Sequence, residues 1–274
     1  TISLRFAKSL APTAFANNQT NCSGILTGIG ITNPNGVTGT TYTWTASPTN
    51  VTGSSAGSGA TIAQLLTSTD GVTNGNVIYT ITPSASGCIG ATFNVTAFVK
   101  ATPVITNTAT QLQTSICANA SLNFIPTSSI AGTTYTWTSV SSGATITGNT
   151  LTGSGTITDA PSNSGNVVGT VTYTITPNFN GCAGSSVNYV VNVLPLPSAN
   201  GTDQTICGGQ LVNIAIDASP KNVVGTTFNW IVLPTSNVSG AVAGNGSLIS
   251  QNLSLTNSLV GSVVYRITPT ANNC

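Results

Sequence analysis

The sequence predicts an all-β fold built from three tandem antiparallel β-sandwich repeats. Three observations predict it: sequence blocks recur with a period near 92 residues, apolar residues alternate with Thr along those blocks, and Thr, Ser, Asn and Gly dominate the polar composition. Such residues favour strands and turns over helices. A fixed period of this length is the signature of an array of like modules.

The first recurring block holds an aromatic residue two positions before a tryptophan. These pairs recur at intervals of 93 residues: Tyr42 and Trp44, Tyr135 and Trp137, Phe228 and Trp230. An exposed pair of this kind could form a platform for sugar binding. Its phase, however, matches the face that carries the other apolar residues, so we expect all six rings in the sandwich core.

The second recurring block is a strand followed by a cysteine. It occupies residues 77–83 (VIYTITP), 171–177 (VTYTITP) and 263–269 (VVYRITP). Val, Tyr and Ile alternate with Thr, which is typical of a half-buried antiparallel strand. Several short strands per repeat, separated by Gly-rich stretches and Pro, indicate an immunoglobulin-like sandwich.

These markers divide the chain into four segments. Residues 11–102 form repeat one, residues 103–196 form repeat two, and residues 197–274 form repeat three, which lacks a last strand of its own. Residues 1–10 are predicted to be the last strand of a preceding or neighbouring repeat.

That strand is assigned by its register. Ile2, Phe93 and Val187 each lie ten residues before a proline, so residues 1–10 align with the segments that close repeats one and two. We expect this strand to complete a different sandwich, either in a preceding covalent repeat or in repeat three of a neighbouring molecule. The donated residues are Thr1, Ile2, Leu4 and Phe6.

Six cysteines, two per repeat, are expected to form disulfides. The first precedes the second predicted strand and the second follows the sixth, so five strands separate them and place them at opposite ends of the sandwich. A strand of about ten residues spans roughly 33 Å, whereas bridged Cα atoms lie within about 7 Å. The first cysteine of one repeat would instead meet the second cysteine of the next repeat.

The predicted bonds are therefore Cys22–Cys182 and Cys117–Cys274, with Cys88 and Cys207 paired to repeats outside this chain. A missing strand would bring both cysteines to the same end of the sandwich. Pairing within each repeat then stays open as the alternative: Cys22–Cys88, Cys117–Cys182 and Cys207–Cys274.

Composition excludes several function classes. Charged residues are 3% of the chain, His and Glu are absent, and the net charge is +1. Acid–base or nucleophilic catalysis lacks its usual groups, so we expect no enzyme. The sequence has neither a Cys-x-x-Cys motif nor an Asp-x-Asp cluster, which argues against metals and cofactors. It also has no basic patch for nucleic acid and no apolar run of about 20 residues to span a membrane.

Four motifs carry a resemblance to a known class of repeats. They are residues 204–207 (QTIC), 132–137 (GTTYTW), 171–182 (VTYTITP followed by NGC) and 191–197 (VNVLPLP). The chain resembles the PKD-like and Ig-like repeats of giant secreted surface proteins of Bacteroidota, including gliding-motility adhesins. The resemblance implies export, an extracellular or cell-surface location, and further repeats outside this chain.

The function these observations favour is structural. We expect the shaft of an extracellular filament or long cell-surface adhesin, built from disulfide-stiffened repeats. The alternative is a repeat array that itself binds glycans or surfaces. The loops are rich in Gly, Ser and Thr, which favours the shaft. The expected partners are further copies of the repeat, joined covalently or by strand exchange, with a glycan or surface ligand elsewhere in the full protein.

Overall fold

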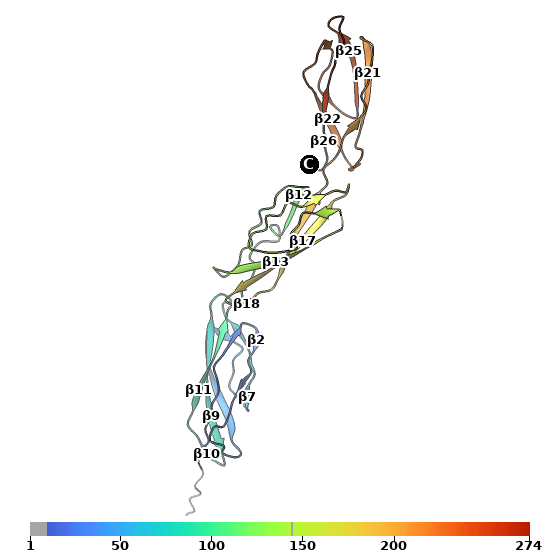
Figure 1. The fold of residues 1–274 in the computed structure, drawn as a ribbon. Coiled ribbons are helices and arrows are strands. Elements are labelled where there is room, and N and C mark those ends of the chain that lie inside the picture. The colour runs from blue at the N-terminus through green and yellow to red at the C-terminus, as the bar shows by residue number, and fades with distance from the viewer. Residues whose placement is uncertain (1–9, 144) are drawn as a thin grey trace, which may run out of the picture. The chain divides into compact units, whose positions relative to one another are not determined.

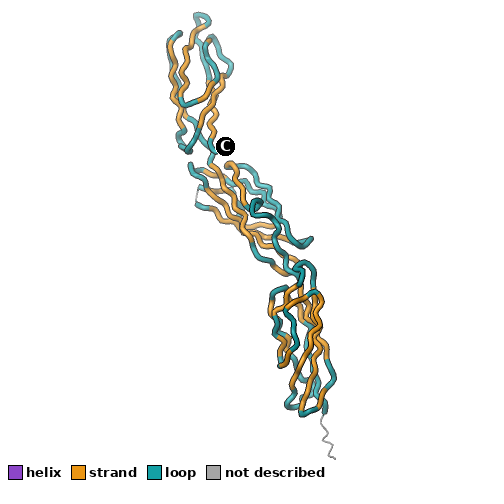
Figure 2. The backbone as a smooth tube through the Cα atoms, turned by 180° about the vertical axis from the view of Figure 1, so that it is seen from behind, coloured by secondary structure: helices purple, strands orange, loops and turns teal. Residues whose placement is uncertain are grey.

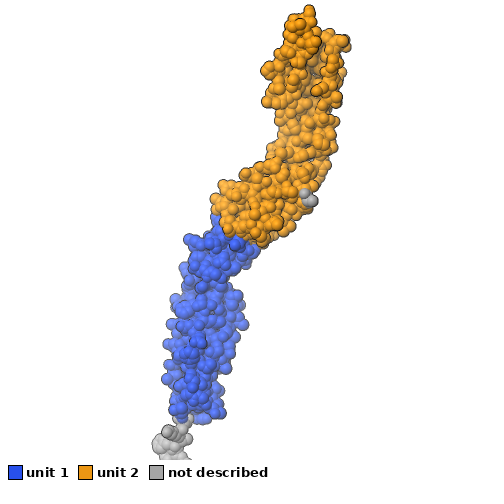
Figure 3. Space-filling model, in the orientation of Figure 1, with its two compact units in different colours: residues 1–106, 126–136, 176–186 blue, residues 107–125, 137–175, 187–274 orange. Residues whose placement is uncertain are grey.

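The computed structural model describes residues 10–143 and 145–274, and these residues form strands and loops with no helix (Figure 2). The chain divides into two compact units (Figure 3). One unit comprises residues 1–106, 126–136 and 176–186, which hold repeat one and one end of repeat two. The other comprises residues 107–125, 137–175 and 187–274, which hold the rest of repeat two and repeat three.

Repeat one is a sandwich of one continuous sheet and one interrupted layer (Figure 1). The continuous sheet has the order β1 (Gln19–Cys22), β11 (Phe93–Lys100), β9 (Gly75–Ala85), β4 (Thr41–Thr49) and β6 (Gly57–Ser58), with β10 (Cys88–Ile89) paired to β9. The facing layer consists of short strands: β2 (Ile25–Leu26), β8 (Leu65–Ser68) and β5 (Val51–Thr52), and β3 (Ile29–Gly30) paired with β7 (Thr61–Ile62).

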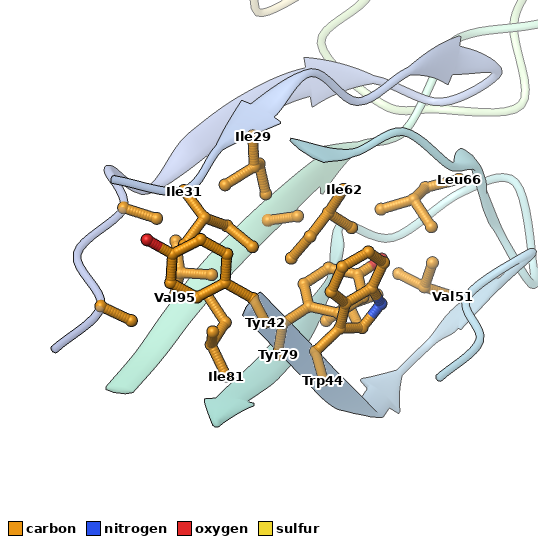
Figure 4. Packing of buried hydrophobic residues seen from close by; sticks show 14 of the residues in the cluster. Ile29, Ile31, Tyr42, Trp44, Val51, Ile62, Leu66, Tyr79, Ile81 and Val95 are labelled. Carbon is orange, nitrogen blue, oxygen red and sulfur yellow. The ribbon is translucent and has the colours of Figure 1, made fainter. Parts of the chain in front are cut away.

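The core of repeat one lies between these layers (Figure 4). Strand β9 buries every second residue from Val77 to Ala85, as its alternation predicts. Tyr42, Trp44 and Tyr79 from the continuous sheet pack with Ile62 and Leu66 from the facing layer. Burial of these large side chains is the main source of stability in such a sandwich.

Repeat two has the same sheet order. Its continuous sheet runs β12 (Gln113–Cys117), β19 (Val187–Leu194), β17 (Gly169–Phe179), β13 (Thr134–Ser141) and β15 (Thr152–Ser154), with β18 (Cys182–Ala183) paired to β17. A second layer includes β14 (Ile146–Thr147) paired with β16 (Ser162–Asn163). In its core Trp137 meets Tyr173 edge-on at 5.5 Å between ring centroids, and Phe124 stacks on Tyr189 at 4.0 Å.

Repeat three repeats only part of this order. One sheet runs β20 (Asn200–Gly201), β21 (Gln210–Asp217), β25 (Leu248–Leu255) and β23 (Val238–Ser239). The other runs β24 (Gly244–Asn245), β22 (Thr227–Val232) and β26 (Tyr265–Thr270), which are the counterparts of β6, β4 and β9. Among the residues that the structure describes, no strand pairs with the other side of β26.

The all-β fold is as predicted, but one edge of the continuous sheets departs from antiparallel pairing. Strand β1 runs parallel to β11, with Cys22 opposite Lys100, and β12 runs parallel to β19, with Cys117 opposite Leu194. Period-two alternation shows which face of a strand is buried but carries no information on strand direction. This parallel edge determines where Cys22 and Cys117, the first cysteines of repeats one and two, lie.

Candidate functional site at the repeat junctions

A tight hairpin turn positions the second cysteine of each repeat. Strands β17 and β18 are joined by Asn180 and Gly181, whose φ angles are 50° and 85°, and Phe179 pairs with Cys182 across the turn. Two central residues with positive φ are the mark of a type I′ hairpin, for which Asn-Gly is the preferred sequence. Ser86-Gly87 and Asn272-Asn273 also have positive φ and precede Cys88 and Cys274.

The parallel edge strand positions the first cysteine. Cys22 ends β1 beside Lys100, the residue that ends β11. It therefore lies at the end of the sandwich where the chain leaves repeat one. Cys88 lies in β10, at the opposite end of β9 from β2 (Figure 1). A bond between Cys22 and Cys88 would have to cross the length of the sandwich.

The structure contains two disulfides, each joining neighbouring repeats. Cys22 is bonded to Cys182 and Cys117 to Cys274, in both cases with Cα atoms 5.6 Å apart. Each links the first cysteine of one repeat to the second cysteine of the next, and each lies within one compact unit. Cys88 is half-buried and Cys207 is exposed, and both are free.

One further contact crosses the first junction, and a second lies beside it within repeat two. The ammonium group of Lys100 donates a hydrogen bond to the carbonyl oxygen of Asn180, 3.0 Å away. Gly184 lies so close to the carbonyl oxygen of Pro103 that an added Cβ would be 1.7 Å from it. The chain entering repeat two therefore passes tightly against the hairpin that carries Cys182, with no room for a side chain.

The predicted core aromatics lie where expected, with one difference. Trp44, Trp137 and Trp230 are only 6–7% exposed, and Tyr42 and Phe228 are also buried. Tyr135 is half-buried rather than buried. Burial raises the pKa of Tyr135, while a hydrogen bond with Ser128 acts in the opposite direction. The tryptophan rings are too buried to serve as a sugar platform.

Each core tryptophan packs against a glycine that the sequence analysis did not single out. A Cβ added to Gly57, Gly153 or Gly244 would lie 2.6, 2.2 or 2.6 Å from the nearest ring atom of Trp44, Trp137 or Trp230. In repeats one and three this glycine is directly opposite the tryptophan on the adjacent strand. A glycine 13 to 16 residues after each tryptophan was the available sequence signal.

The strand tyrosine of each repeat makes a recurring polar contact. The hydroxyl groups of Tyr79, Tyr173 and Tyr265 donate to Gln64 (2.6 Å), Asp159 (2.7 Å) and Gln251 (2.7 Å). Burial raises the pKa of Tyr79 to about 12. These contacts satisfy polar groups that would be costly to bury alone.

Two aspartates act as acceptors within the fold. Asp159 accepts from Thr150 as well as from Tyr173. Asp70 accepts from the side chain and backbone of Thr73 and from the backbone of Val72, and these bonds hold the pKa of its carboxyl well below the usual range. In residues 10–143 and 145–274, no group of three or more Cys, Asp, Glu or His is arranged to hold a metal ion.

The predicted donated strand, with Thr1, Ile2, Leu4 and Phe6, lies outside the described residues. None of the described residues forms a helix that is long and apolar enough to cross a membrane.

Comparison with known families now identifies the repeats. The sequence model of the PKD-like domain matches three segments: residues 19–103, 114–197 and 204–274. The chain belongs to the PKD-like domain family. Each matched segment begins three residues before the first cysteine of a repeat. Cys182 lies inside the second segment, and Cys274 is the last residue of the third.

Solved structures show distant likeness to tandem β-sandwich proteins. An I-band fragment of titin is 10% identical with a TM-score of 0.41, and covers 96% of this chain and 95% of its own. A fragment of mouse cadherin-23 is 11% identical with a TM-score of 0.34, with 89% of each chain covered. The human desmocollin-1 ectodomain is 12% identical with a TM-score of 0.31, covering 94% of this chain and 60% of its own. These values support no functional inference, and no curated protein matches the sequence.

Proposed function

We propose that this chain forms part of the shaft of an extracellular filament or long cell-surface adhesin, in which disulfides stiffen the junctions between PKD-like repeats. The observation that carries the proposal is the position of the two bonds. Cys22–Cys182 and Cys117–Cys274 each connect one repeat to the next instead of closing a single repeat.

A second covalent connection at a junction restricts its motion. Interfaces between domains of one chain are usually small and polar, so relative motion is the default. At the first junction the chain itself connects the repeats near Pro103, and the disulfide adds a connection through Cys22 and Cys182. Two connections at different points oppose the bending and twisting that one flexible linker would allow.

The chemistry of the chain supports an extracellular, non-catalytic role. Disulfides persist in oxidising surroundings outside the cytosol. The sequence contains no His or Glu for general acid–base catalysis, and its tryptophan rings are buried instead of displayed. The resemblance to repeats of Bacteroidota surface proteins, including gliding-motility adhesins, points to the same location. The buried rings favour the shaft over a glycan-binding array.

The stiffening is tested by single-molecule energy transfer across the first junction. Dyes attached through unnatural amino acids at the exposed residues Thr52 and Thr138 report on repeats one and two. We expect a narrow distance distribution for the oxidised protein and a broad one for Cys22→Ser/Cys182→Ser. Cys88→Ser, which removes a free thiol, is the matched control and should leave the distribution narrow. Equal widths for the oxidised protein and the double variant would contradict the proposal.

A further inference from the structure

The two disulfides overlap along the sequence. Cys22–Cys182 closes a loop that contains Cys117, and Cys117–Cys274 closes a loop that contains Cys182. Residues 118–181 therefore lie inside both loops. Overlap of this kind decides which parts of the chain lengthen when it is pulled.

The first disulfide removes most of repeat one from the route that tension follows. Tension applied between a residue before Cys22 and a residue after Cys182 passes through the S–S bond, which holds the two Cα atoms 5.6 Å apart. In an open chain the same separation of 160 residues extends to roughly 500 Å, at about 3.3–3.6 Å per residue. Residues 23–116 thus add nothing to the extended length, whether they are folded or unfolded.

Within repeat one, the route follows only β1 and the residues before it. All four residues of β1 pair with β11, from Gln19 opposite Ala97 to Cys22 opposite Lys100. When the bond is reduced, tension that enters at the start of β1 leaves at the end of β11, because the two strands are parallel. The load then crosses the hydrogen bonds between these strands and reaches the core of the repeat. The intact bond carries the load past both.

Two routes in parallel lead on from Cys182. One follows the chain forward through β19 and repeat three to Cys274. The other runs backward through residues 118–181 to Cys117, which lies opposite Leu194 at the end of β19, and crosses the second bond to Cys274. The backward route contains fewer residues, so it limits how far the forward route is drawn out.

The first bond is also protected from reduction. A thiolate breaks a disulfide by attacking one of its sulfur atoms, so the rate depends on access to them. Cys182 is 1% exposed and Cys22 is half-buried. The bond is therefore covered while the junction is folded.

We propose that the overlapping disulfides form a strap that limits the extension of the shaft. Tension passes along β1, through Cys22–Cys182 and on to Cys117–Cys274, while the core of repeat one stays outside its route. The proposal rests on the proposed shaft function for its purpose, because a limit on extension matters only in a structure that is pulled. The lengths that it predicts depend on the two bonds alone.

Extension is tested by pulling single molecules of the 274-residue protein in optical tweezers, between tags fused to its two ends. The residues left on each route predict a maximum extension of about 300 Å for the oxidised protein and about 900 Å after reduction with dithiothreitol. An oxidised protein that extends as far as the reduced one would overturn the proposal.

The overlap has its own signature in variants. Removing one bond, in Cys22→Ser/Cys182→Ser or Cys117→Ser/Cys274→Ser, leaves a route of about 400 Å, because the remaining loop still holds most of the chain. Each removal alone should therefore add only about 100 Å, although the loss of both bonds adds about 600 Å. Cys88→Ser is the matched control and should stay at about 300 Å. Separate gains that sum to about 600 Å would indicate two independent loops and overturn the proposal.

These lengths are independent of whether a repeat is folded. A variant that folds poorly therefore still gives a result, once mass spectrometry of alkylated cysteines shows that its remaining bond is formed.

The route past the core is tested with Gly57→Ala, which crowds the Trp44 ring. In the reduced protein, repeat one should unfold in a step of about 300 Å, at lower force in Gly57→Ala than in Gly28→Ala, whose added Cβ meets no atom within 4 Å. In the oxidised protein this step should be absent from both variants. Its presence there would place the core on the tension route and overturn the proposal. Equal widths in the energy-transfer experiment would contradict the stiffening but leave these lengths unchanged, so the two proposals fail independently.

Discussion

At the scale of single residues, the core of each repeat depends on a tryptophan ring that packs directly against a glycine, where any larger residue would place its side chain. Trp44 in β4 lies over Gly57 in β6, and Trp137 and Trp230 lie over Gly153 and Gly244. Protein interiors are packed as tightly as organic crystals, so a methyl group added at such a contact must displace the ring. The glycine is as much a part of the core as the tryptophan.

Gly57→Ala is expected to destabilise repeat one. The new Cβ would lie 2.6 Å from the Trp44 ring, and overpacking of this kind typically costs about 1–3 kcal/mol. The matched control is Gly28→Ala, whose Cβ would meet no atom within 4 Å, and which should change stability by less than about 0.5 kcal/mol. Urea unfolding followed by tryptophan fluorescence measures both. Equal stability of the two variants would contradict the packing argument.

At the scale of elements, two small features place the four bonded cysteines at the junctions. The parallel edge strand brings Cys22 and Cys117 to the end where the chain leaves a repeat. The two-residue hairpin turn brings Cys182 and Cys274 to the end where the chain enters one. Both features are regular backbone structures, so the disulfide geometry follows from hydrogen-bonded ladders instead of loops.

Gly181→Val should weaken the Cys22–Cys182 bond. Gly181 has a φ of 85°, which a β-branched residue adopts only with strain, so the turn that presents Cys182 would be displaced. A cost of about 1.4 kcal/mol corresponds to a tenfold easier reduction by dithiothreitol, measured by mass spectrometry of alkylated cysteines. Gly87→Val strains the same turn in repeat one, where Cys88 is free, and should leave reduction of Cys22–Cys182 unchanged. A similar change in both variants would refute the role of the turn.

At the scale of the whole molecule, the disulfides link the stability of successive repeats. Cys22–Cys182 joins residues 160 apart in sequence, and Cys117–Cys274 joins residues 157 apart. Closing loops of this length removes unfolded-chain entropy worth about 5 kcal/mol per bond in the loop-closure model. The chain between the bonded residues of the first disulfide includes most of repeats one and two, so that bond acts on two repeats together.

Cys22→Ser/Cys182→Ser should therefore lower the unfolding temperature of repeats one and two and separate their transitions in calorimetry. Cys207→Ser, which removes a free thiol from repeat three, should leave the trace unchanged. An unchanged trace for the double variant would show that the bond does not link the two repeats.

The sequence by itself determined the repeat array, the all-β class and most of the core. These follow from local patterns: Trp137 and Tyr173 recur at fixed positions, and the alternation of β17 marks its buried face. Tyr135 shows the limit of this reasoning, because alternation identifies the inward face but not how far along the sandwich the core extends.

Only the tertiary structure decided how the strands and cysteines are arranged. The order of six cysteines allows pairing within repeats or across junctions, and the choice depends on which end of the sandwich each cysteine occupies. That depends on the parallel pairing of β1 with β11 and β12 with β19, which brings together residues about 80 positions apart. The contacts between the tryptophans and the glycines beneath them are of the same kind, because they also join residues on different strands. A residue pattern records what a strand buries, but only the folded chain shows which strand lies beside it and in which direction.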